Sequence, residues 1–275
     1  MVIWKRYRAL TRFDHLHLML SAGDKSPPVS SKQPDRFLLI EGSLHSAVSA
    51  RTGGLAPGLI REDGEVNSSR PFPIVVLASG GGTNLQAILD QLHGRGEVEV
   101  VGVGSDKAGA YALERAEAVN VPSAVFARDE FPDRESRDMA MADWIDSTGA
   151  ELVALAGYMQ LVSASFVERF RGRIVNVHPA LLPSFPGLDA IGQALEQGVK
   201  VTGVTVHFVD EGTDTGPVIS QQAVEVPANW DRDELEAAIH AVEHRIYPEA
   251  IGMIARGEVK IADDDPRKVN VARVK

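Results

Sequence analysis

The chain has 275 residues, of which 44% are hydrophobic and 24% are charged, with a formal net charge of -10 and no cysteine. This composition is ordinary for a globular protein of one large or two small domains, and the missing cysteine excludes disulfides, thiolate metal sites and a cysteine nucleophile. The acidic balance argues against nucleic acid as a partner, because binding to a phosphate backbone needs a basic face.

The first residues resemble neither a membrane anchor nor a signal peptide. The apolar stretch near the start is interrupted by Arg12 and Asp14, and no clear small-residue cleavage site follows it. Nowhere does an apolar run approach the roughly 20 residues that a membrane span needs. We therefore expect a cytoplasmic protein with no membrane partner.

Composition divides the chain near residue 70. Residues 1–70 hold 10 Lys and Arg against 7 Asp and Glu, a net charge of +3, so the remainder carries -13. Segments 23–35 and 51–71 are rich in turn formers and lack periodicity. We predict a weakly ordered extension over 1–70 without a catalytic role, a catalytic domain over 71–265 and a tail over 266–275.

From residue 72, apolar strands alternate with segments of helical period. The predicted strands are 73–79, 98–105, 123–127, 151–157, 173–178, 201–210 and 216–226. The predicted helices are 84–92, 110–120, 134–149, 163–170, capped by Ser163, and 231–257, in which Pro248 should introduce a bend. This alternation predicts an α/β fold: a single open, mostly parallel, Rossmann-like sheet with helices on both faces.

A glycine loop, SGGGTN at 79–84, joins the first strand to the first helix. Glycines let the backbone approach a ligand, and the first helical amides, at Thr83 and Asn84, would point at an anion such as phosphate. The loop is neither a Walker motif nor GxGxxG, since position 85 is Leu. A tight strand-to-helix turn explains the glycines equally well.

Three polar residues form the candidate catalytic group. Asn176 and His178 are two residues apart on a strand, so their side chains share a face, and Asp214 precedes a Gly-Pro turn. Each alone fits a structural role, but His178 ends its strand at the sheet edge where ligands bind in open α/β folds. His207, in mid-strand, fits a packed or hydrogen-bonded support.

Five motifs carry a resemblance over residues 72–262. They are IVVLASGGGTNLQAIL, ELVALAGYMQLVS, RIVNVHPALLPSFPG, GVTVHFVDEGTDTGPVI and EHRIYP. With them the chain resembles the phosphoribosylglycinamide formyltransferase family. The resemblance implies the formyltransferase fold and a one-carbon transferase of purine biosynthesis. Its members move the formyl group of 10-formyltetrahydrofolate to the amine of glycinamide ribonucleotide, without a metal.

The resemblance also implies the site residues. Asn176, His178 and Asp214 take the catalytic positions, with an oxyanion intermediate stabilised by Asn176 and His178. The substrate-binding positions are Gly82, Thr83, Asn84 and Glu243. The formyl-folate positions are Arg134, Met159, Gln160, Leu161, Val162 and Asn176. Because a carboxylate at Asp214 favours the imidazolium form, we expect the pKa of His178 to lie above its ordinary value.

The chain departs from the family pattern in three places. Gln160 stands where the family often has Arg, and Asp189-Ala190-Ile191 stands in a loop that commonly carries histidines. Residues 1–70 have no counterpart in the ordinary bacterial enzyme. We assign no catalytic role to the Asp189 loop.

Alternatives remain open at this point. Formyltetrahydrofolate deformylase resembles the core, but it lacks the glycine-rich phosphate loop and carries a compact leading domain. Methionyl-tRNA formyltransferase needs a basic carboxyl-terminal domain. A non-catalytic nucleotide-binding protein of the same fold would need no Asn–His–Asp set. Small-molecule substrates are the expected partners, and a homodimer is one option for the assembly.

Overall fold

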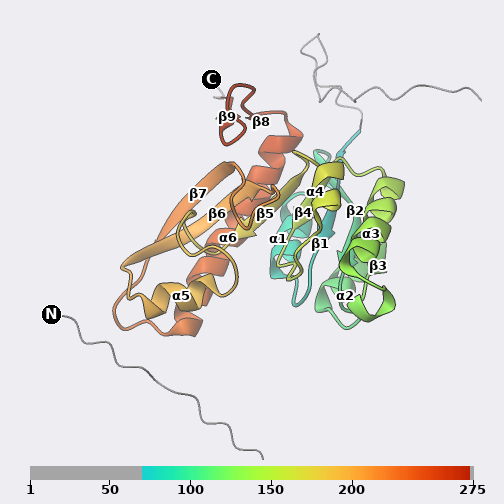
Figure 1. The fold of residues 1–275 in the computed structure, drawn as a ribbon. Helices are drawn as coiled ribbons and strands as arrows, with labels where there is room; N and C mark the ends of the chain where they lie inside the picture. Colours follow the sequence, from blue (N-terminus) through green and yellow to red (C-terminus); the bar gives the residue numbers. More distant parts are fainter. Residues whose placement is uncertain (1–69, 273–275) are drawn as a thin grey trace, which may run out of the picture. The chain divides into compact units, whose positions relative to one another are not determined.

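The computed structural model describes residues 70–272, which build a seven-stranded sheet in the order β3-β2-β1-β4-β5-β6-β7 (Figure 1). The strands are β1 Phe72–Leu77, β2 Val98–Ser105, β3 Ser123–Val125, β4 Leu152–Leu155, β5 Ile174–His178, β6 Val201–Phe208 and β7 Val218–Glu225. β1 to β5 run parallel, whereas β6 is antiparallel to β5 and β7 to β6. The predicted mostly parallel α/β sheet is confirmed.

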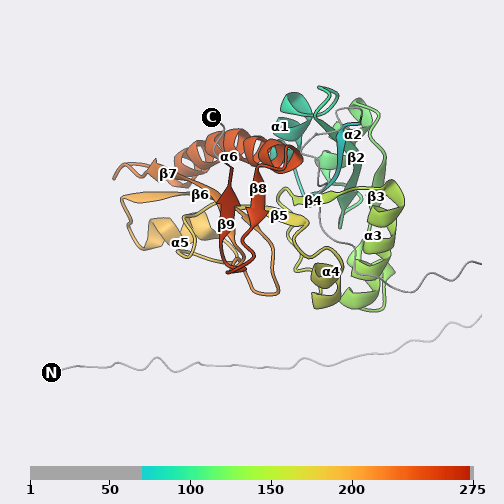
Figure 2. The ribbon, with the colours of Figure 1, turned by 90° about the horizontal axis from the view of Figure 1, so that it is seen from above.

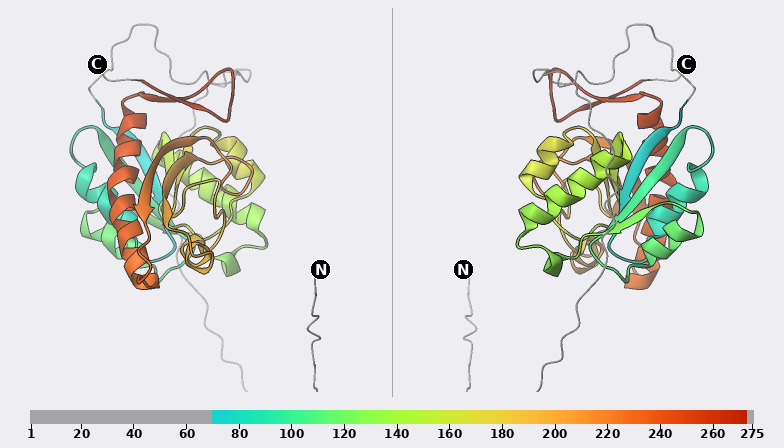
Figure 3. Two further views of the ribbon diagram at one scale, coloured as in Figure 1. Left: turned by 90° about the vertical axis from the view of Figure 1, so that its left-hand side faces the viewer. Right: turned by 90° about the vertical axis from the view of Figure 1, so that its right-hand side faces the viewer.

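Helices cover both faces of this sheet (Figure 2). They are α1 Thr83–Gln91, α2 Tyr111–Ala118, α3 Arg134–Thr148, α4 Ala164–Arg169, α5 Ala190–Glu196 and α6 Arg232–Ala255. α1, α2 and α6 pack on one face and α3 and α4 on the other, as the two end-on views show (Figure 3). The β1 residues alternate between the layers: Ile74 and Val76 face the first, Val75 and Leu77 the second.

The sequence did not predict four short elements, one of which is the 3-10 helix η1 at Arg128–Glu130. α5 has only seven residues, and β8 Val259–Ile261 pairs antiparallel with β9 Val269–Val271. Such short segments carry little periodic signal. The predicted boundary at 265 lies within this hairpin. The predicted extension, apart from Arg70, lies outside the described residues, as do residues 273–275.

α6 runs through Pro248 without interruption, because another helix replaces the bond that proline removes. Proline has no N–H to donate to the carbonyl four residues earlier, which here belongs to His244. The side chain of Gln91, at the end of α1, donates to that carbonyl at 2.7 Å. This bond joins the carboxyl end of α1 to α6. No helix within residues 70–272 combines the length and apolar character needed to cross a bilayer.

Candidate active site

A cavity of about 1630 Å³ opens at the carboxyl ends of the parallel strands. Its walls come from the loops that follow β1, β4, β5 and β6, together with the start of α3 and one face of α6. This is where open α/β sheets bind ligands. Every predicted site residue lines it: Gly82, Thr83, Asn84, Arg134, Met159, Gln160, Leu161, Val162, Asn176, His178, Asp214 and Glu243. Their roles in chemistry remain predictions.

The glycine loop forms one end of the cavity. Gly82 caps α1 in the left-handed conformation, with φ +66°, which glycine adopts without strain. A Cβ there would lie 2.8 Å from the Cβ of Ala112 in α2, so the loop and α2 are in close contact. Within the described chain, the amide N–H groups of Gly81, Gly82 and Thr83 have no hydrogen-bond acceptor. They are donors available to an anion.

Glu243 lies next to this loop, on α6. It is buried and accepts a hydrogen bond from the Asn84 side chain at 2.8 Å. Burial raises the pKa of its carboxyl group, opposed by the bond from Asn84. The side-chain amide of Asn84 therefore orients Glu243. The backbone N–H of Asn84 is then the group of this residue that could bind an anion.

The pairing of β5 with β6 positions the catalytic candidates at the other end of the cavity. Asn176 stands directly opposite His207 in the antiparallel register, so the two side chains share a face. The Nδ1 of His207 donates to the Phe208 carbonyl at 2.8 Å, so in the neutral ring Nε2 can accept from the Asn176 amide at 3.3 Å. His207 thus orients Asn176, whose second N–H remains for the cavity, and the predicted support role fits this geometry.

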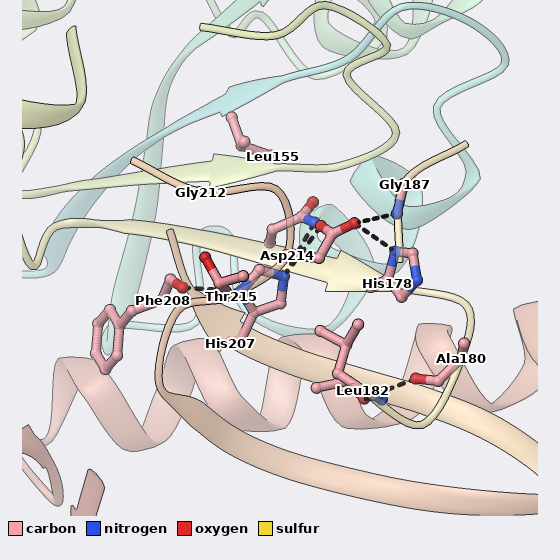
Figure 4. Close-up of polar contacts among 12 residues, drawn as sticks. Leu155, His178, Ala180, Leu182, Gly187, His207, Phe208, Gly212, Asp214 and Thr215 are labelled. Atoms are coloured by element: carbon pink, nitrogen blue, oxygen red, sulfur yellow. Dashed lines mark hydrogen bonds and ion pairs between the residues drawn. The ribbon is translucent and has the colours of Figure 1, made fainter. Parts of the chain in front are cut away.

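Asp214 joins the two histidines (Figure 4). One carboxylate oxygen lies 3.4 Å from Nδ1 of His178 and accepts from the Gly187 amide at 2.7 Å, and the other lies 3.6 Å from Nε2 of His207. Asp214 has φ +54°, a left-handed conformation that is uncommon outside glycine and recurs at functional sites. The chain thus brings Asp214 to His178 across 36 residues, as the hypothesis requires.

The remaining nitrogen of His178, Nε2, donates to the Phe185 carbonyl at 2.8 Å. Burial lowers the pKa of His178, and the Asp214 carboxylate and the Phe185 carbonyl offset this only in part. Our expectation of a raised pKa was therefore wrong, because it counted the neighbouring charge and not the loss of water around the ring. For Asp214, burial acts to raise the pKa, but His207, the Gly187 amide and the charge of His178 together lower it.

Segment 159–162 forms a wall of the cavity. It follows β4, which lies between β1 and β5 in the sheet, and its Met159 amide donates to the Ser79 hydroxyl of the glycine loop at 2.8 Å. Met159 and Leu161 leave 63% and 66% of their surfaces exposed. Gln160, where we noted a missing guanidinium, donates to Asp106 at 2.9 Å and lies 3.3 Å from Arg137 Nη1. The guanidinium of Arg137, which belongs to α3, therefore lies next to this wall.

A buried ion pair that sequence reasoning missed supports this wall. Arg137 donates to Asp138 at 2.7 Å, and Asp138 accepts from the Ser163 amide at 2.6 Å. Both residues lie on α3, whose start is capped by Asp133, and Arg134 occupies the first position of that helix. The charged residues at 137 and 138 gave no signal of their own, because adjacent charges on a helix usually face solvent.

The loop that follows β5 contains Asp189, at a place where the family pattern commonly has histidines. Asp189 caps α5 by accepting from the Gly192 amide at 3.3 Å and forms an ion pair with Arg232 at 2.7 Å. Both residues line the cavity, and the ion pair connects the loop to the start of α6. Within the described part of the chain, no cluster of three or more His, Cys, Asp or Glu side chains is arranged to hold a metal ion.

Comparison with known proteins shows the family of the chain. The formyl transferase family model matches residues 73–251. The phosphoribosylglycinamide formyltransferase of Bacillus subtilis is 42% identical, over 66% of this chain and 96% of its own length. The trifunctional purine biosynthetic protein adenosine-3 of Drosophila melanogaster is also 42% identical, over 72% of this chain, and the match spans only 15% of that longer protein.

Solved structures give the same result. Glycinamide ribonucleotide transformylase 1 from Symbiobacterium toebii superposes with a TM-score of 0.71 and 47% identity, covering 74% of this chain and 96% of that one. The phosphoribosylglycinamide formyltransferase of Coxiella burnetii gives a TM-score of 0.69 at 36% identity, over 74% of this chain and 94% of its own. The resemblance inferred from the motifs is confirmed, and the chain belongs to the formyl transferase family.

Proposed function

We propose that this chain transfers a formyl group from 10-formyltetrahydrofolate to the amine of glycinamide ribonucleotide, a step of purine biosynthesis. One observation carries the proposal: free backbone donors and the Asn176–His178–Asp214 group lie at two ends of one cavity. Its volume of about 1630 Å³ exceeds the roughly 300–1,000 Å³ usual for one small ligand. Two substrates can therefore lie side by side.

The glycine loop fits the phosphate of the nucleotide substrate. The amides of Gly82, Thr83 and Asn84 stand at the amino end of α1, where the helix dipole favours an anion. Glu243, one helix away, is a buried acceptor for the N–H or O–H groups of the same substrate. This directs the substrate amine toward the catalytic end.

The wall formed by segment 159–162 fits the folate. Met159 and Leu161 offer exposed apolar surface to a flat ring, and the backbone of segment 159–162 offers polar groups to its edge. Arg134 lines the cavity and has no carboxylate within 4.0 Å among residues 70–272, so its charge is available to a substrate carboxylate. When bound, the folate supplies the formyl carbon that the amine attacks.

The catalytic residues act on the formyl oxygen as negative charge develops there. Asn176 donates its second N–H, held in direction by His207. His178 donates through Nε2, exchanging the Phe185 carbonyl for the formyl oxygen, and this charge-assisted bond strengthens as the oxygen becomes negative. Asp214 supports the imidazolium through Nδ1 and takes the proton of the attacking nitrogen, directly or through water. That proton passes to the folate nitrogen as its bond to the formyl carbon breaks, and tetrahydrofolate leaves.

A formyl-transfer assay with 10-formyltetrahydrofolate, with and without glycinamide ribonucleotide, tests the proposal. We expect tetrahydrofolate release to require the nucleotide. Equal release in its absence would identify a deformylase instead. No release, together with measurable nucleotide binding, would identify a non-catalytic binding protein.

The remaining expectations belong to the same proposal. Residues 71–265 hold the catalytic domain, in keeping with a family match over 73–251 and with cavity residues that fall between 79 and 243. We propose a cytoplasmic location, no nucleic-acid partner and a homodimer as a possible assembly. A chain shortened to begin at Ser69 should keep most of its activity; loss of activity in a folded shortened chain would contradict this division.

A further inference from the structure

The carbonyl groups of the glycine loop are bound from behind by α2. The Ala112 amide donates to the Gly80 carbonyl at 3.1 Å, and the Arg115 Nε donates to the Gly81 carbonyl at 2.8 Å. A side chain and a backbone amide of one helix therefore fix two successive peptide groups of the loop. No motif in the sequence indicated this contact.

These two bonds determine where the next amides point. A trans peptide is planar, and its C=O and N–H point in opposite directions. Because the carbonyls of Gly80 and Gly81 point toward α2, the N–H groups of Gly81 and Gly82 point away from it. Gly81 and Gly82 line the cavity, and their N–H groups have no acceptor within residues 70–272. Two donors are thus held ready for an anion.

Arg115 is itself held in position and keeps its charge. Its Nη1 donates to the Gln86 side chain at 2.7 Å, and its guanidinium lies 4.8 Å from the centre of the Tyr111 ring. No carboxylate of the described chain lies within 4.0 Å of it, whereas Arg137 has one such partner and Arg256 has two. A positive charge without a paired acid therefore stands directly behind the amino end of α1, where it adds to the helix dipole.

We propose that Arg115 is a positioning residue for the substrate phosphate. It binds no ligand atom. It fixes the Gly81–Gly82 peptide so that its amides meet the phosphate, and it contributes positive potential from behind the loop. This inference rests on the proposed function, which places the nucleotide phosphate at this loop.

The test is to replace Arg115 and compare the two substrates. Arg115→Met keeps the aliphatic stem and loses both the bond and the charge. We expect the KM for glycinamide ribonucleotide to rise about ten- to a hundred-fold, the usual effect of losing hydrogen bonds to a charged group. The KM for the folate and kcat should stay within about twofold. Arg115→Lys keeps the charge and an N–H donor group. Its KM for the nucleotide should therefore lie between that of the unaltered chain and that of Arg115→Met.

Two controls separate positioning from general damage. Arg256→Met removes a guanidinium paired with Glu97 and Glu258, away from the cavity, and should change neither KM. Thermal unfolding shows whether each variant is folded. If Arg115→Met does not fold, Arg115→Lys and Gln86→Ala, which releases Nη1, carry the test. An unchanged nucleotide KM in folded variants would overturn the proposal, as would equal rises for both substrates.

Calorimetry with glycinamide ribonucleotide and with inorganic phosphate distinguishes this inference from the proposed function. Weaker binding of both to Arg115→Met than to the unaltered chain supports the role of Arg115 even if no formyl transfer occurs. Tight phosphate binding that is unaffected by Arg115→Met overturns it even if formyl transfer is confirmed.

Discussion

The two ends of the cavity are built from different chemical groups. At the glycine loop the ligand-facing groups are backbone amides without acceptors, directed by α2. At the catalytic end they are side chains from β5, β6 and the loop before β7, and most of their polar atoms already have partners in the protein. The carboxylate of Asp214, for example, contacts three residues, His178, His207 and Gly187 (Figure 4).

This difference predicts different behaviour toward substrate. The loop presents free donors, so an anion can bind without breaking a bond in the protein. At the catalytic end the Nε2–H of His178 is already hydrogen-bonded to the Phe185 carbonyl, and the substrate oxygen must replace that carbonyl. Changes at the loop should therefore appear in the KM of the nucleotide, and changes at the catalytic end should appear in kcat.

The largest effect is expected at Asn176. Removing one donor from a preorganised oxyanion site typically costs on the order of a hundred- to a thousand-fold in rate. Asn176→Ala should therefore lower kcat by about that factor, with the nucleotide KM little changed. Since Asn176 and His178 act on the same oxygen, the double variant should lose less than the product of the single losses.

Steady-state kinetics with both substrates measures this. Thr202→Val, on β6, removes a buried hydroxyl that has no hydrogen-bond partner and serves as the control. A normal kcat in Asn176→Ala, with only KM raised, would remove Asn176 from the catalytic group and would weaken the contrast between the two ends.

The second effect is expected at Gly82. Gly82→Ala places a Cβ 2.8 Å from Ala112 and forces an L residue to φ +66°, which costs about 1–3 kcal/mol of stability. Because the loop must shift, the nucleotide KM should also rise, on the order of tenfold. Gly81→Ala meets no atom within 4 Å and has no positive φ, so its stability should stay within about 0.5 kcal/mol.

Urea unfolding and steady-state kinetics together test this pair of variants. Equal stability of the two would mean that the contact between Gly82 and α2 carries no constraint. Weakening of both substrates to the same degree by Gly82→Ala would mean that the loop has a purely structural role.

The difference between the two ends also explains what sequence could predict. Asn176 and His178 follow from strand alternation, and Gly82 from a turn between a strand and a helix, because those rules act over a few residues. The bond between Asn84 and Glu243 joins residues 159 apart, and the bond between Arg115 and Gly81 joins residues 34 apart. Such contacts depend on how helices pack, which a local pattern does not encode.

The pKa of His178 shows the same limit in electrostatics. The sequence indicated a carboxylate partner, which is correct in geometry, but the degree of burial depends on the whole fold. Burial dominates and lowers the pKa. A carboxylate placed next to a histidine is therefore insufficient to predict the sign of the shift in the histidine pKa.

The third prediction uses that sign. Asp214→Asn removes a charge that holds the pKa of His178 up, so the pKa should fall further below its ordinary value. An NMR titration of the His178 ring in the variant and in the unaltered chain measures it. An unchanged His178 titration in the folded variant would show that the charge coupling is absent, even if formyl transfer were confirmed.

The same shift predicts a pH dependence of stability. Because the folded pKa of His178 is lowered, the unfolded chain takes up the proton first as pH falls below the ordinary value of about 6.5. The free energy of unfolding should therefore decrease from neutral pH toward the folded pKa, and His178→Gln should show a smaller decrease. Urea unfolding at several pH values measures it, and an identical decrease in the variant would contradict the assignment. His244, whose pKa burial also lowers, accounts for part of the remaining decrease.

The smallest effect concerns the scaffold that both ends share. Gln91 donates to the His244 carbonyl that Pro248 leaves without its helical partner. Gln91→Ala should lower the free energy of unfolding by about 0.5–1.5 kcal/mol, the usual contribution of one hydrogen bond. The KM of neither substrate should change, because neither Gln91 nor His244 lines the cavity.

A double-mutant cycle with Pro248→Ala tests the cause of this effect. Alanine restores the N–H that proline lacks, so the His244 carbonyl regains a helical donor and no longer depends on Gln91. In the Pro248→Ala background, Gln91→Ala should therefore cost much less than in the unaltered chain. Equal costs in both backgrounds, measured by urea unfolding, would mean that Gln91 stabilises the helix pair by packing. The continuity of α6 through Pro248 would then need another explanation.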